Sequence, residues 1–314
     1  MPYLIGTDEA GYGPNLGPLV IGATVWRVPE LNVDLYELLG DVVSPGVAVG
    51  KLAIADSKQL FHPGGGLAHL ETGLFAGLES MGVRPRSWRD VWRSLASQAN
   101  TRLAHLPWYR DYDTPLPLDA EDEDIATRAH QWQVACRKCD VALVGVRCRA
   151  VFPDEFNTVT DRLDSKGALL SQCTLQLVAD LLGDLDDHVR ISCDKHGGRN
   201  RYAPLLQEVF AESLFQVVCE SRQESVYRWT AGRFSREISF VAKGESFLPS
   251  ALASMAAKYL RELAMGAFNH FWQQHIPDLK PTAGYPQDAR RFKAAIREAQ
   301  QKLQIPDRIL WRTR

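Results

Sequence analysis

The 314-residue sequence predicts an α/β protein in which helices cover a mixed β-sheet. Three observations support this class. Apolar runs of strand length alternate with longer stretches of helical periodicity along most of the chain. Gly- and Pro-containing turns separate these runs. Hydrophobic residues make up 45% of the chain, which is sufficient for a substantial core.

The predicted strands are short, and several of them end beside an acidic residue. We expect strands at residues 3–7, 19–28, 46–55, 141–151, 189–193 and 214–220. The first is followed by Asp8, the third by Asp56 and the fifth by Asp194. The carboxylates therefore lie where strands deliver side chains to the edge of a sheet.

The predicted helices fill the rest of the chain. We expect them at residues 165–182, 202–210, 250–271 and 288–303, with a largely helical stretch over 67–140 that prolines interrupt. Trp88 and Trp92 are four residues apart in this stretch and share one helix face. Such a pair is typical of core packing rather than of a base-stacking surface.

Asp8 and Glu9 are adjacent, at the end of the first apolar run and before a glycine-rich turn. Neighbouring side chains on a strand point to opposite faces, so both reach one ion only if the strand ends or bulges there. The following glycines make such an irregularity inexpensive. Since hard divalent cations prefer carboxylate oxygens, the pair predicts half of a metal site, with an Asx-type turn as the alternative.

Five blocks of the sequence occur in the order known from one enzyme family. They are residues 8–14 (Asp-Glu-Ala-Gly-Tyr-Gly-Pro), 55–60 (Ala-Asp-Ser-Lys-Gln-Leu), 189–194 (Val-Arg-Ile-Ser-Cys-Asp), 243–262 (from Lys-Gly-Glu-Ser to Arg-Glu) and 284–288 (Gly-Tyr-Pro-Gln-Asp). Together they resemble the type 2 ribonucleases H, which are ribonucleases HII and HIII. Residues 61 to about 150 match nothing in that family.

The resemblance implies a fold, an activity and a set of site residues. The fold is a ribonuclease H-like sheet flanked by helices, with a helical insertion and a helical C-terminal portion. The activity is a metal-dependent endoribonuclease that cuts the RNA strand of RNA/DNA hybrids, leaving 5′-phosphate and 3′-hydroxyl ends with two Mg²⁺ or Mn²⁺ ions. The catalytic and metal-binding residues are then Asp8, Glu9, Asp194 and Glu262. The substrate-binding residues are Gly11, Tyr12, Gly13, Lys58, Lys243, Lys258 and Tyr285.

Two positions depart from the ribonuclease HII pattern. The turn Gly11-Tyr12-Gly13 has tyrosine where that branch has arginine, and Glu262 resembles the HIII branch. The substrate is therefore left open between an RNA/DNA hybrid and a duplex with a single ribonucleotide, both of which offer a 2′-hydroxyl for recognition.

Charge is distributed unevenly along the chain. The net charge of −2 gives no sign of a nucleic-acid partner. Residues 280–314, however, carry nine Lys or Arg and three acids, whereas residues 111–125 carry seven acids and no base. Because phosphate binding depends on local contacts, the tail predicts a basic nucleic-acid surface, with a merely solvated helix face as the alternative.

Three other functions compete with the nuclease. One alternative is a catalytically weak nucleic-acid-binding member of the same fold, although all four acids are retained. Another is a nucleotide-phosphate loop of a kinase or dehydrogenase at the glycine-rich turn, which lacks the Lys-Ser/Thr of a P-loop and the Gly-x-Gly-x-x-Gly spacing. Cys136 and Cys139 have zinc-ligand spacing, yet no second pair completes a four-ligand site.

The chain is expected to be a cytoplasmic monomer. No run approaches the ~18 apolar residues of a membrane span, and the start lacks a signal-peptide pattern. We divide the chain into a catalytic domain over residues 1–262, with a helical insertion at about 61–140, and a basic helical extension over 263–314 that packs on it.

Overall fold

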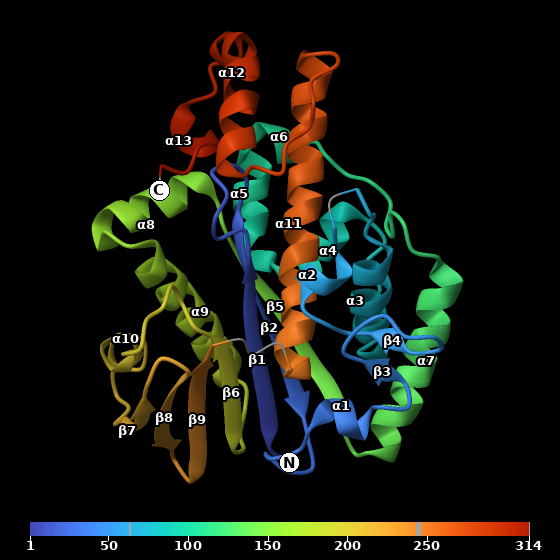
Figure 1. Ribbon diagram of the computed structural model, residues 1–314, viewed down its shortest axis with the longest axis vertical. Coiled ribbons are helices and arrows are strands. Elements are labelled where there is room, and N and C mark those ends of the chain that lie inside the picture. Colours follow the sequence, from blue (N-terminus) through green and yellow to red (C-terminus); the bar gives the residue numbers. More distant parts are fainter. Residues whose placement is uncertain (63, 243–245, 314) are drawn as a thin grey trace.

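A seven-stranded mixed sheet forms the centre of the computed structural model, which describes residues 1–62, 64–242 and 246–313 (Figure 1). The strand order is β5 (Ala142–Val151), β2 (Leu19–Arg27), β1 (Tyr3–Ala10), β6 (Val189–Asp194), β9 (Phe234–Val241), β8 (Glu224–Ala231) and β7 (Gln216–Glu220). β1 is antiparallel to β2 and parallel to β6, and β6 is parallel to β9. The predicted mixed α/β class is confirmed.

Different helices cover the two faces of the central strands. α11 (Leu248–His275) packs on one face, where Gly6 and Gly22 allow close approach. A Cβ atom at these positions would lie 2.2 and 2.4 Å from backbone atoms of α11. α9 (Lys166–Leu182) covers the other face, against Leu19 and Ile21. In Figure 1 α11 runs along β1, which brings residues far apart in the sequence to the same end of the sheet.

The predicted helical insertion is present and is part of the core. It contains α3 (Ala68–Ser80), α4 (Trp88–Leu95), the 3-10 helix η1 (Ser97–Ala99), α5 (Asn100–His105), α6 (Pro107–Arg110) and α7 (Asp122–Lys138). Trp88 and Trp92 are buried with ring centroids 5.5 Å apart, so their predicted role in packing is confirmed. The Trp88 indole N–H also donates to the Leu263 carbonyl of α11 at 3.1 Å.

A buried carboxylate connects the acidic loop of the insertion to α3 and α11. Glu71 on α3 is fully buried and accepts hydrogen bonds from the backbone N–H groups of Leu118, Asp119 and Ala120 at 2.6, 2.7 and 2.9 Å. The Tyr259 hydroxyl of α11 donates to the same carboxylate at 2.7 Å. The insertion is therefore joined to the helix that crosses the sheet.

Several boundaries differ from the predicted ones. Of residues 46–55 only β4 (Leu52–Ala53) is a strand, and it pairs with β3 (Val43–Ser44) in a separate small sheet. The short helices α1 (Leu35–Leu38) and α2 (Ser57–Leu60) flank these strands. α8 (Pro153–Leu163) and the β8–β9 hairpin were not predicted. In the hairpin, charged residues such as Arg228 and Glu237 interrupt the apolar alternation, and they pair across the strands at 2.6 Å.

The C-terminal portion is helical, as predicted. α12 (Pro286–Lys302) and α13 (Asp307–Leu310) lie at one end of the molecule beside the second half of α11 (Figure 1). Phe292 on α12 packs on Phe268 of α11 with ring centroids 5.5 Å apart. α11 is continuous across residues 262 and 263, where the predicted domain boundary lies. Of the helices in the described part of the chain, none combines the length and hydrophobicity of a membrane span.

Candidate active site

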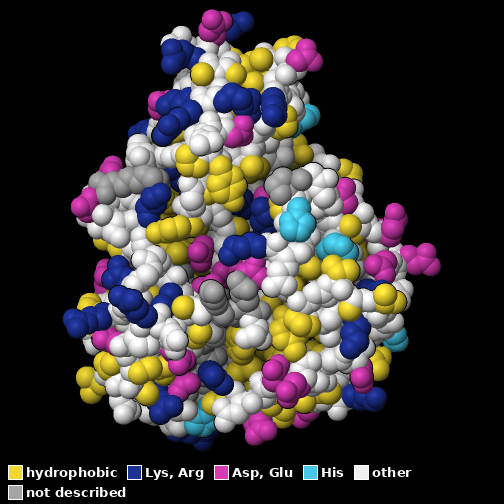
Figure 2. All heavy atoms as spheres, in the orientation of Figure 1, with side chains coloured by type: hydrophobic (Ala, Val, Ile, Leu, Met, Phe, Trp, Pro, Cys, Tyr) yellow, Lys and Arg dark blue, Asp and Glu magenta, His cyan; other side chains and the backbone are white. Residues whose placement is uncertain are grey.

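Three acids meet where two parallel strands separate. The pairing of β1 with β6 ends at Thr7 and Cys193, and the next residues are Asp8, Glu9 and Asp194. The carboxyl ends of adjacent parallel strands are a common location for ligand sites in α/β sheets. Here they border a pocket of about 620 Å³. Figure 2 shows acidic side chains, with basic ones beside them, in a hollow at the centre of this face.

Ten of the eleven site residues predicted from the sequence line this one pocket. They are Asp8, Glu9, Gly11, Tyr12, Gly13, Lys58, Asp194, Lys258, Glu262 and Tyr285. The eleventh, Lys243, lies outside the described residues. The residues come from β1, the glycine-rich turn, α2, β6, α11 and the loop before α12, so the fold gathers side chains that are up to 277 positions apart in the sequence.

The pair Asp8 and Glu9 reaches the pocket without the strand ending between them. β1 continues to Ala10 and stays in regular register with β2, so the expected end or bulge at this point was wrong. The two side chains alternate between faces as in any strand. Both still line the pocket, and beyond Thr7 no strand among the described residues pairs with β1 on its β6 side.

Burial and mutual repulsion make the carboxylates hard to ionise. Burial, followed by the charges of Glu9 and Asp194, raises the pKa of Asp8 well above its usual range. Burial and the Asp194 charge also raise the pKa of Glu9 to about 7, against which Lys58 acts in the opposite direction. A cluster of this kind favours binding of a cation or a proton.

Asp56 adds a further acid that was not predicted as a site residue. It raises the pKa of both Asp8 and Glu9. Its carboxylate caps α2 by accepting from the Lys58 N–H at 2.8 Å. The Ser57 N–H in turn donates to the Ser254 hydroxyl of α11 at 3.2 Å. An Asp before Ser-Lys is a helix-cap signal, but the position of this cap beside the other acids is not readable from the sequence.

Lys258 and Glu262 form the α11 wall of the pocket. Their side chains are 19% and 20% exposed, and the Lys258 Nζ lies 2.5 Å from the Glu262 Oε1. The same ammonium group lies 4.1 Å from the centre of the Phe61 ring, a cation–π contact. Phe61 lines the pocket but was not predicted. Glu262 is thus held by a cation on its own helix.

Arg261 holds the glycine-rich turn in place. It is 3% exposed, and its guanidinium donates to the carbonyl oxygens of Pro18, Leu16 and Ala283 at 2.6, 3.3 and 2.9 Å. Gly11 has φ +86°, and a Cβ atom there would lie 2.8 Å from Arg261. Glycine therefore satisfies both the positive φ and the close contact.

The C-terminal tail is a second support of the same turn. Trp311 bridges to Leu16, and the Arg312 N–H donates to the Asn15 carbonyl at 2.8 Å. The Asn157 side chain of α8 donates to the Trp311 carbonyl at 2.8 Å. Arg312 is itself fully buried, so it is not part of the basic surface expected from residues 280–314.

Three basic residues of α12, Arg290, Lys293 and Arg297, border an open groove of about 630 Å³. Arg290 and Arg297 are exposed there. Lys293 is paired with Asp307 at 2.7 Å and lies 4.8 Å from the Trp311 ring. The groove therefore offers free charge mainly through the two arginines.

The P-loop and dinucleotide-binding forms of the nucleotide alternative do not fit the fold. A P-loop or a dinucleotide-binding loop leads into a helix, whose N-terminus binds the phosphate. Here the glycine-rich turn connects β1 to the antiparallel strand β2. The turn is therefore neither a P-loop nor a dinucleotide-binding loop.

The donor chemistry of the pocket fits a hard divalent cation, although the ligands are not assembled. Among residues 1–62, 64–242 and 246–313, no three His, Cys, Asp or Glu side chains are arranged to hold a metal ion. Asp8, Glu9 and Asp194 nonetheless line one pocket, and their negative charges repel one another. Mg²⁺ and Mn²⁺ prefer oxygen donors such as these carboxylates.

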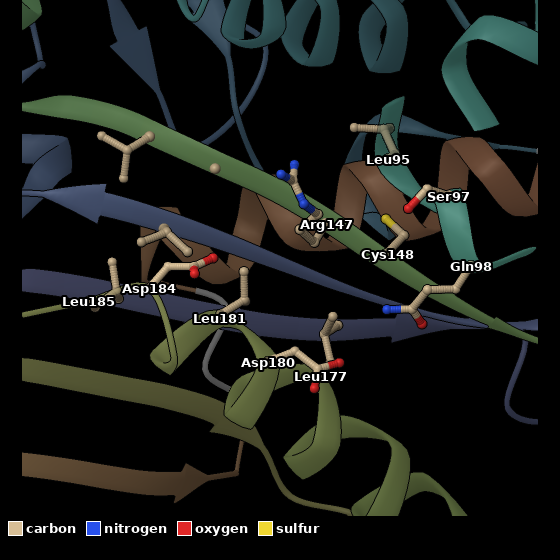
Figure 3. A pocket seen from close by; sticks show the side chains of 13 residues that line it. Leu95, Ser97, Gln98, Arg147, Cys148, Leu177, Asp180, Leu181, Asp184 and Leu185 are labelled. Atoms are coloured by element: carbon tan, nitrogen blue, oxygen red, sulfur yellow. The ribbon is translucent and has the colours of Figure 1, made fainter. Parts of the chain in front are cut away.

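A smaller cavity, of about 200 Å³, lies between β5, η1 and the end of α9 (Figure 3). Leu177 and Leu181 supply apolar wall, and Arg147, Asp180 and Asp184 supply polar groups. None of the ten predicted site residues that the structure describes lines it. It is separate from the acidic pocket.

Solved structures resemble this chain over nearly its whole length. Ribonuclease H2 from Pyrococcus horikoshii OT3 has a TM-score of 0.46 and 17% identity, with 98% of this chain and 92% of that chain covered. The ribonuclease HII in the PCNA:RNase HII complex from Archaeoglobus fulgidus has a TM-score of 0.42 and 15% identity, with 99% and 94% covered. Bst-RNase HIII in complex with Mn²⁺ has a TM-score of 0.40 and 14% identity, with 99% and 66% covered.

Comparison with protein-family models finds no match, and comparison with curated proteins finds none either. The structural likeness is too distant to carry an argument about activity. The chain is similar to type 2 ribonucleases H, and its own sheet and pocket support the functional argument that follows.

Proposed function

We propose that this protein is a metal-dependent endoribonuclease that cuts the RNA strand of RNA/DNA hybrids or of ribonucleotide-containing duplexes. One observation carries the proposal. The four acids, two lysines and Tyr285 predicted from separate sequence blocks line a single pocket at the carboxyl ends of two parallel strands. The division into a catalytic domain over 1–262 and a basic extension over 263–314 is part of the same proposal.

Asp8, Glu9, Asp194 and Glu262 are the residues that would hold two Mg²⁺ or Mn²⁺ ions. Such ions, when bound, activate water and stabilise the leaving oxygen in an in-line displacement at phosphorus. Glu262 can take part through Oε2 while Oε1 stays paired with Lys258 at 2.5 Å, or it can leave that pair. Leaving the pair would release the Lys258 ammonium group for a phosphate of the substrate.

The other residues position the substrate. Lys58 has a side chain that is 82% exposed, at the mouth of the pocket, where it can approach a phosphate. Tyr285 is 56% exposed at the rim and offers a ring for a sugar beside the cut. The backbone of Gly11 and Gly13 faces the same space, in a turn that Arg261 holds rigid. A ribose 2′-hydroxyl there would select RNA over DNA.

Labelled duplexes with no, one or several ribonucleotides test the proposal. The protein is incubated with each duplex in EDTA, Mg²⁺ or Mn²⁺, and the ends are mapped. We expect cuts only beside ribonucleotides and only with metal, leaving 5′-phosphate and 3′-hydroxyl ends. Asp194→Asn keeps the size of the side chain and removes a ligand charge, so it should keep the fold and lower the rate by at least about a hundredfold.

Two results would overturn the proposal. Near wild-type cleavage by Asp194→Asn would show that the acids are not the metal ligands. Duplex binding without cleavage under any metal condition would instead support the catalytically weak binding protein. A contaminating nuclease is excluded if the variant, purified in the same way, is inactive.

A further inference from the structure

Tyr285 lies at the rim of the acidic pocket, at the end of the loop of residues 276–285 that joins α11 to α12. It is 56% exposed, so its position depends mainly on the backbone that carries it. The Ala289 N–H of α12 donates to the Tyr285 carbonyl at 2.7 Å. The contacts that hold this loop therefore decide where the ring lies relative to the pocket.

Thr282, three residues before Tyr285, is buried and fixes the loop through its hydroxyl. The hydroxyl accepts from the Gly284 N–H at 2.9 Å and donates to the Asp288 carboxylate of α12 at 2.5 Å. It thus connects the residues on both sides of Tyr285. An amide N–H only donates and an ionised carboxylate only accepts, so the group between them must do both, as a hydroxyl does.

The backbone of Thr282 is fixed as well. The Asn269 side chain of α11 accepts from the Thr282 N–H and donates to the Thr282 carbonyl, both at 3.0 Å. The Asp288 carboxylate also accepts from Arg291 at 2.8 Å. Thr282 therefore joins α11, through Asn269, to α12, through Asp288.

The loop that Thr282 holds is hydrogen-bonded to the glycine-rich turn. The Gly284 carbonyl accepts from the Asn15 N–H at 2.8 Å and from the Leu16 N–H at 3.3 Å. Gly284 has φ +83°, and a Cβ atom there would lie 2.6 Å from the Leu16 carbonyl oxygen. Because the Thr282 hydroxyl binds the N–H of the same glycine, it acts where the turn and the Tyr285 loop meet.

Thr282 itself is set back from the place where a substrate binds. The described walls of the acidic pocket include Ala283 and Tyr285 but not Thr282. Its hydroxyl bonds are to Gly284 and Asp288, and neither partner is one of the four acids. A change at Thr282 therefore reaches the substrate through the segments that it holds.

We propose that Thr282 is a positioning residue for ribose recognition. Its hydroxyl fixes Tyr285 relative to the backbone of Gly11 and Gly13, so that both sides of the pocket mouth meet the sugar beside the cut. The proposal rests on the proposed nuclease function and adds a specificity-determining residue outside the pocket. It predicts that the Thr282 hydroxyl affects discrimination between RNA and DNA and leaves metal binding unchanged.

Thr282→Val tests this role, because it keeps the shape of the side chain and removes both hydroxyl bonds. Discrimination is measured in EDTA as the Kd for a DNA duplex divided by the Kd for an RNA/DNA hybrid. We expect the variant to lower this ratio on the order of tenfold. In cleavage with Mn²⁺, KM for the hybrid should rise while kcat changes by less than about twofold.

A double-mutant cycle with Tyr285→Ala shows whether Thr282 acts through the tyrosine. Tyr285→Ala should lower the discrimination ratio by itself. Adding Thr282→Val to it should change the ratio by less than about twofold, because the group that Thr282 positions is already absent. An independent role of Thr282 would instead give the product of the two single effects.

Two further variants separate positioning from loss of stability. Thr282→Ser keeps the hydroxyl and should recover most of the discrimination. Thr160→Val removes another buried threonine hydroxyl, which donates to the Phe156 carbonyl within α8, and should leave discrimination unchanged. Thermal unfolding shows which variants are folded. If Thr282→Val is not, Asp288→Ala removes the acceptor of the same hydroxyl and should lower the ratio in its place.

The positioning proposal is overturned by wild-type discrimination in the folded Thr282→Val variant, or in Asp288→Ala where that variant takes its place. Effects of Thr282→Val and Tyr285→Ala that multiply, or a wild-type protein that binds both duplexes equally, would overturn it too. If hybrids are still cut in those cases, the nuclease proposal stands alone. If nothing is cut but the predicted changes in discrimination appear, Thr282 positions a binding site and the nuclease proposal fails.

Discussion

Lys258 and Glu262 are paired one turn apart on α11, with Nζ and Oε1 2.5 Å apart at the wall of the acidic pocket. Glu262 is therefore neutralised by its own helix, whereas Asp8 and Glu9 are crowded by other acids. The Phe61 ring also contacts this ammonium group, with its centre 4.1 Å from the Lys258 Nζ. Pairing with Lys258 therefore holds Glu262 apart from Asp8, Glu9 and Asp194 until the pair opens.

A double-mutant cycle of Lys258→Gln and Glu262→Gln measures that pairing. In EDTA we expect a coupling free energy of unfolding of about 1 kcal/mol, because the pair is only partly exposed. With saturating Mn²⁺ the coupling should fall toward zero if Glu262 turns to the ion. Urea unfolding of the four proteins gives the values. Equal coupling in both conditions would mean that Glu262 stays with Lys258 when the ion is bound.

Glu9→Gln tests the repulsion among the acids through pH. In the metal-free protein the pKa of Glu9 is raised from 4.5 to about 7. A raised carboxyl pKa gives stability that is complete below the usual value and is lost as pH rises through the folded one. Wild type should therefore lose on the order of 3 kcal/mol between about pH 4.5 and 8 relative to Glu9→Gln.

Unfolding of both proteins in EDTA across this pH range gives the difference. Mg²⁺ or Mn²⁺ at pH 8 should stabilise wild type more than the variant, because the ion offsets the repulsion. Parallel pH curves for the two proteins would show that Glu9 is not buried among like charges.

Glu71 tests how firmly the insertion is joined to the core. Glu71→Ala leaves three backbone N–H groups and the Tyr259 hydroxyl without their acceptor, so we expect a loss of about 4 kcal/mol in the free energy of unfolding. Tyr259→Phe removes one donor and should cost about 1 kcal/mol. Asp122→Ala, which breaks an exposed pair with Arg86, is the control and should change stability by less than about 0.5 kcal/mol.

Much of the fold follows from local pattern, and the exceptions have non-local causes. The strands predicted at 19–28 and 141–151 and the helix predicted at 250–271 are present as β2, β5 and α11, because apolar periodicity is strong there. The β8–β9 hairpin was missed because strand pairing, not apolar alternation, stabilises its charged residues. The strand predicted at 46–55 was wrong outside β4, because only two residues of this range pair with another strand.

The candidate site, like the fold, was predicted in part from local sequence blocks and depends in part on long-range contacts. The sequence blocks named Asp8, Glu9 and Asp194, yet it is the end of the β1–β6 ladder at Thr7 that opens a common space for them. The contact of Phe61 with Lys258 depends on how α2 meets α11, which no spacing in the sequence encodes. The burial of Arg312 is hidden by a run of basic residues that otherwise predicts surface charge.

The exposed arginines of α12 test the basic surface. Arg290→Gln with Arg297→Gln should lower duplex affinity and flatten its salt dependence by up to about two units, since each phosphate contact adds roughly one. The paired Lys293 and Arg291 are poorer choices, because Asp307 and Asp288 already neutralise them. Fluorescence anisotropy at several salt concentrations gives the slope. An unchanged slope would show that this groove faces away from the duplex.

Tyr12 tests which ribonucleotide pattern the enzyme prefers. Tyrosine at the centre of the turn supplies no cation, so recognition of one 2′-hydroxyl rests on the turn backbone and Tyr285. We therefore expect faster cleavage within runs of ribonucleotides than at a single one in DNA. Tyr12→Arg should raise activity at the single ribonucleotide relative to the hybrid, by the ~1 to 3 kcal/mol of a charged hydrogen bond.

Tyr12→Phe is the matched control, because it keeps the ring and adds no charge. It should leave the preference between the two duplexes unchanged, since the expected gain comes from the guanidinium. The ratio of kcat/KM for the two duplexes is the measurement, because it cancels differences in the amount of active enzyme. If the unaltered protein cuts isolated ribonucleotides as well as it cuts runs, the tyrosine is no barrier, and recognition of the 2′-hydroxyl must come from groups other than a cation in this turn.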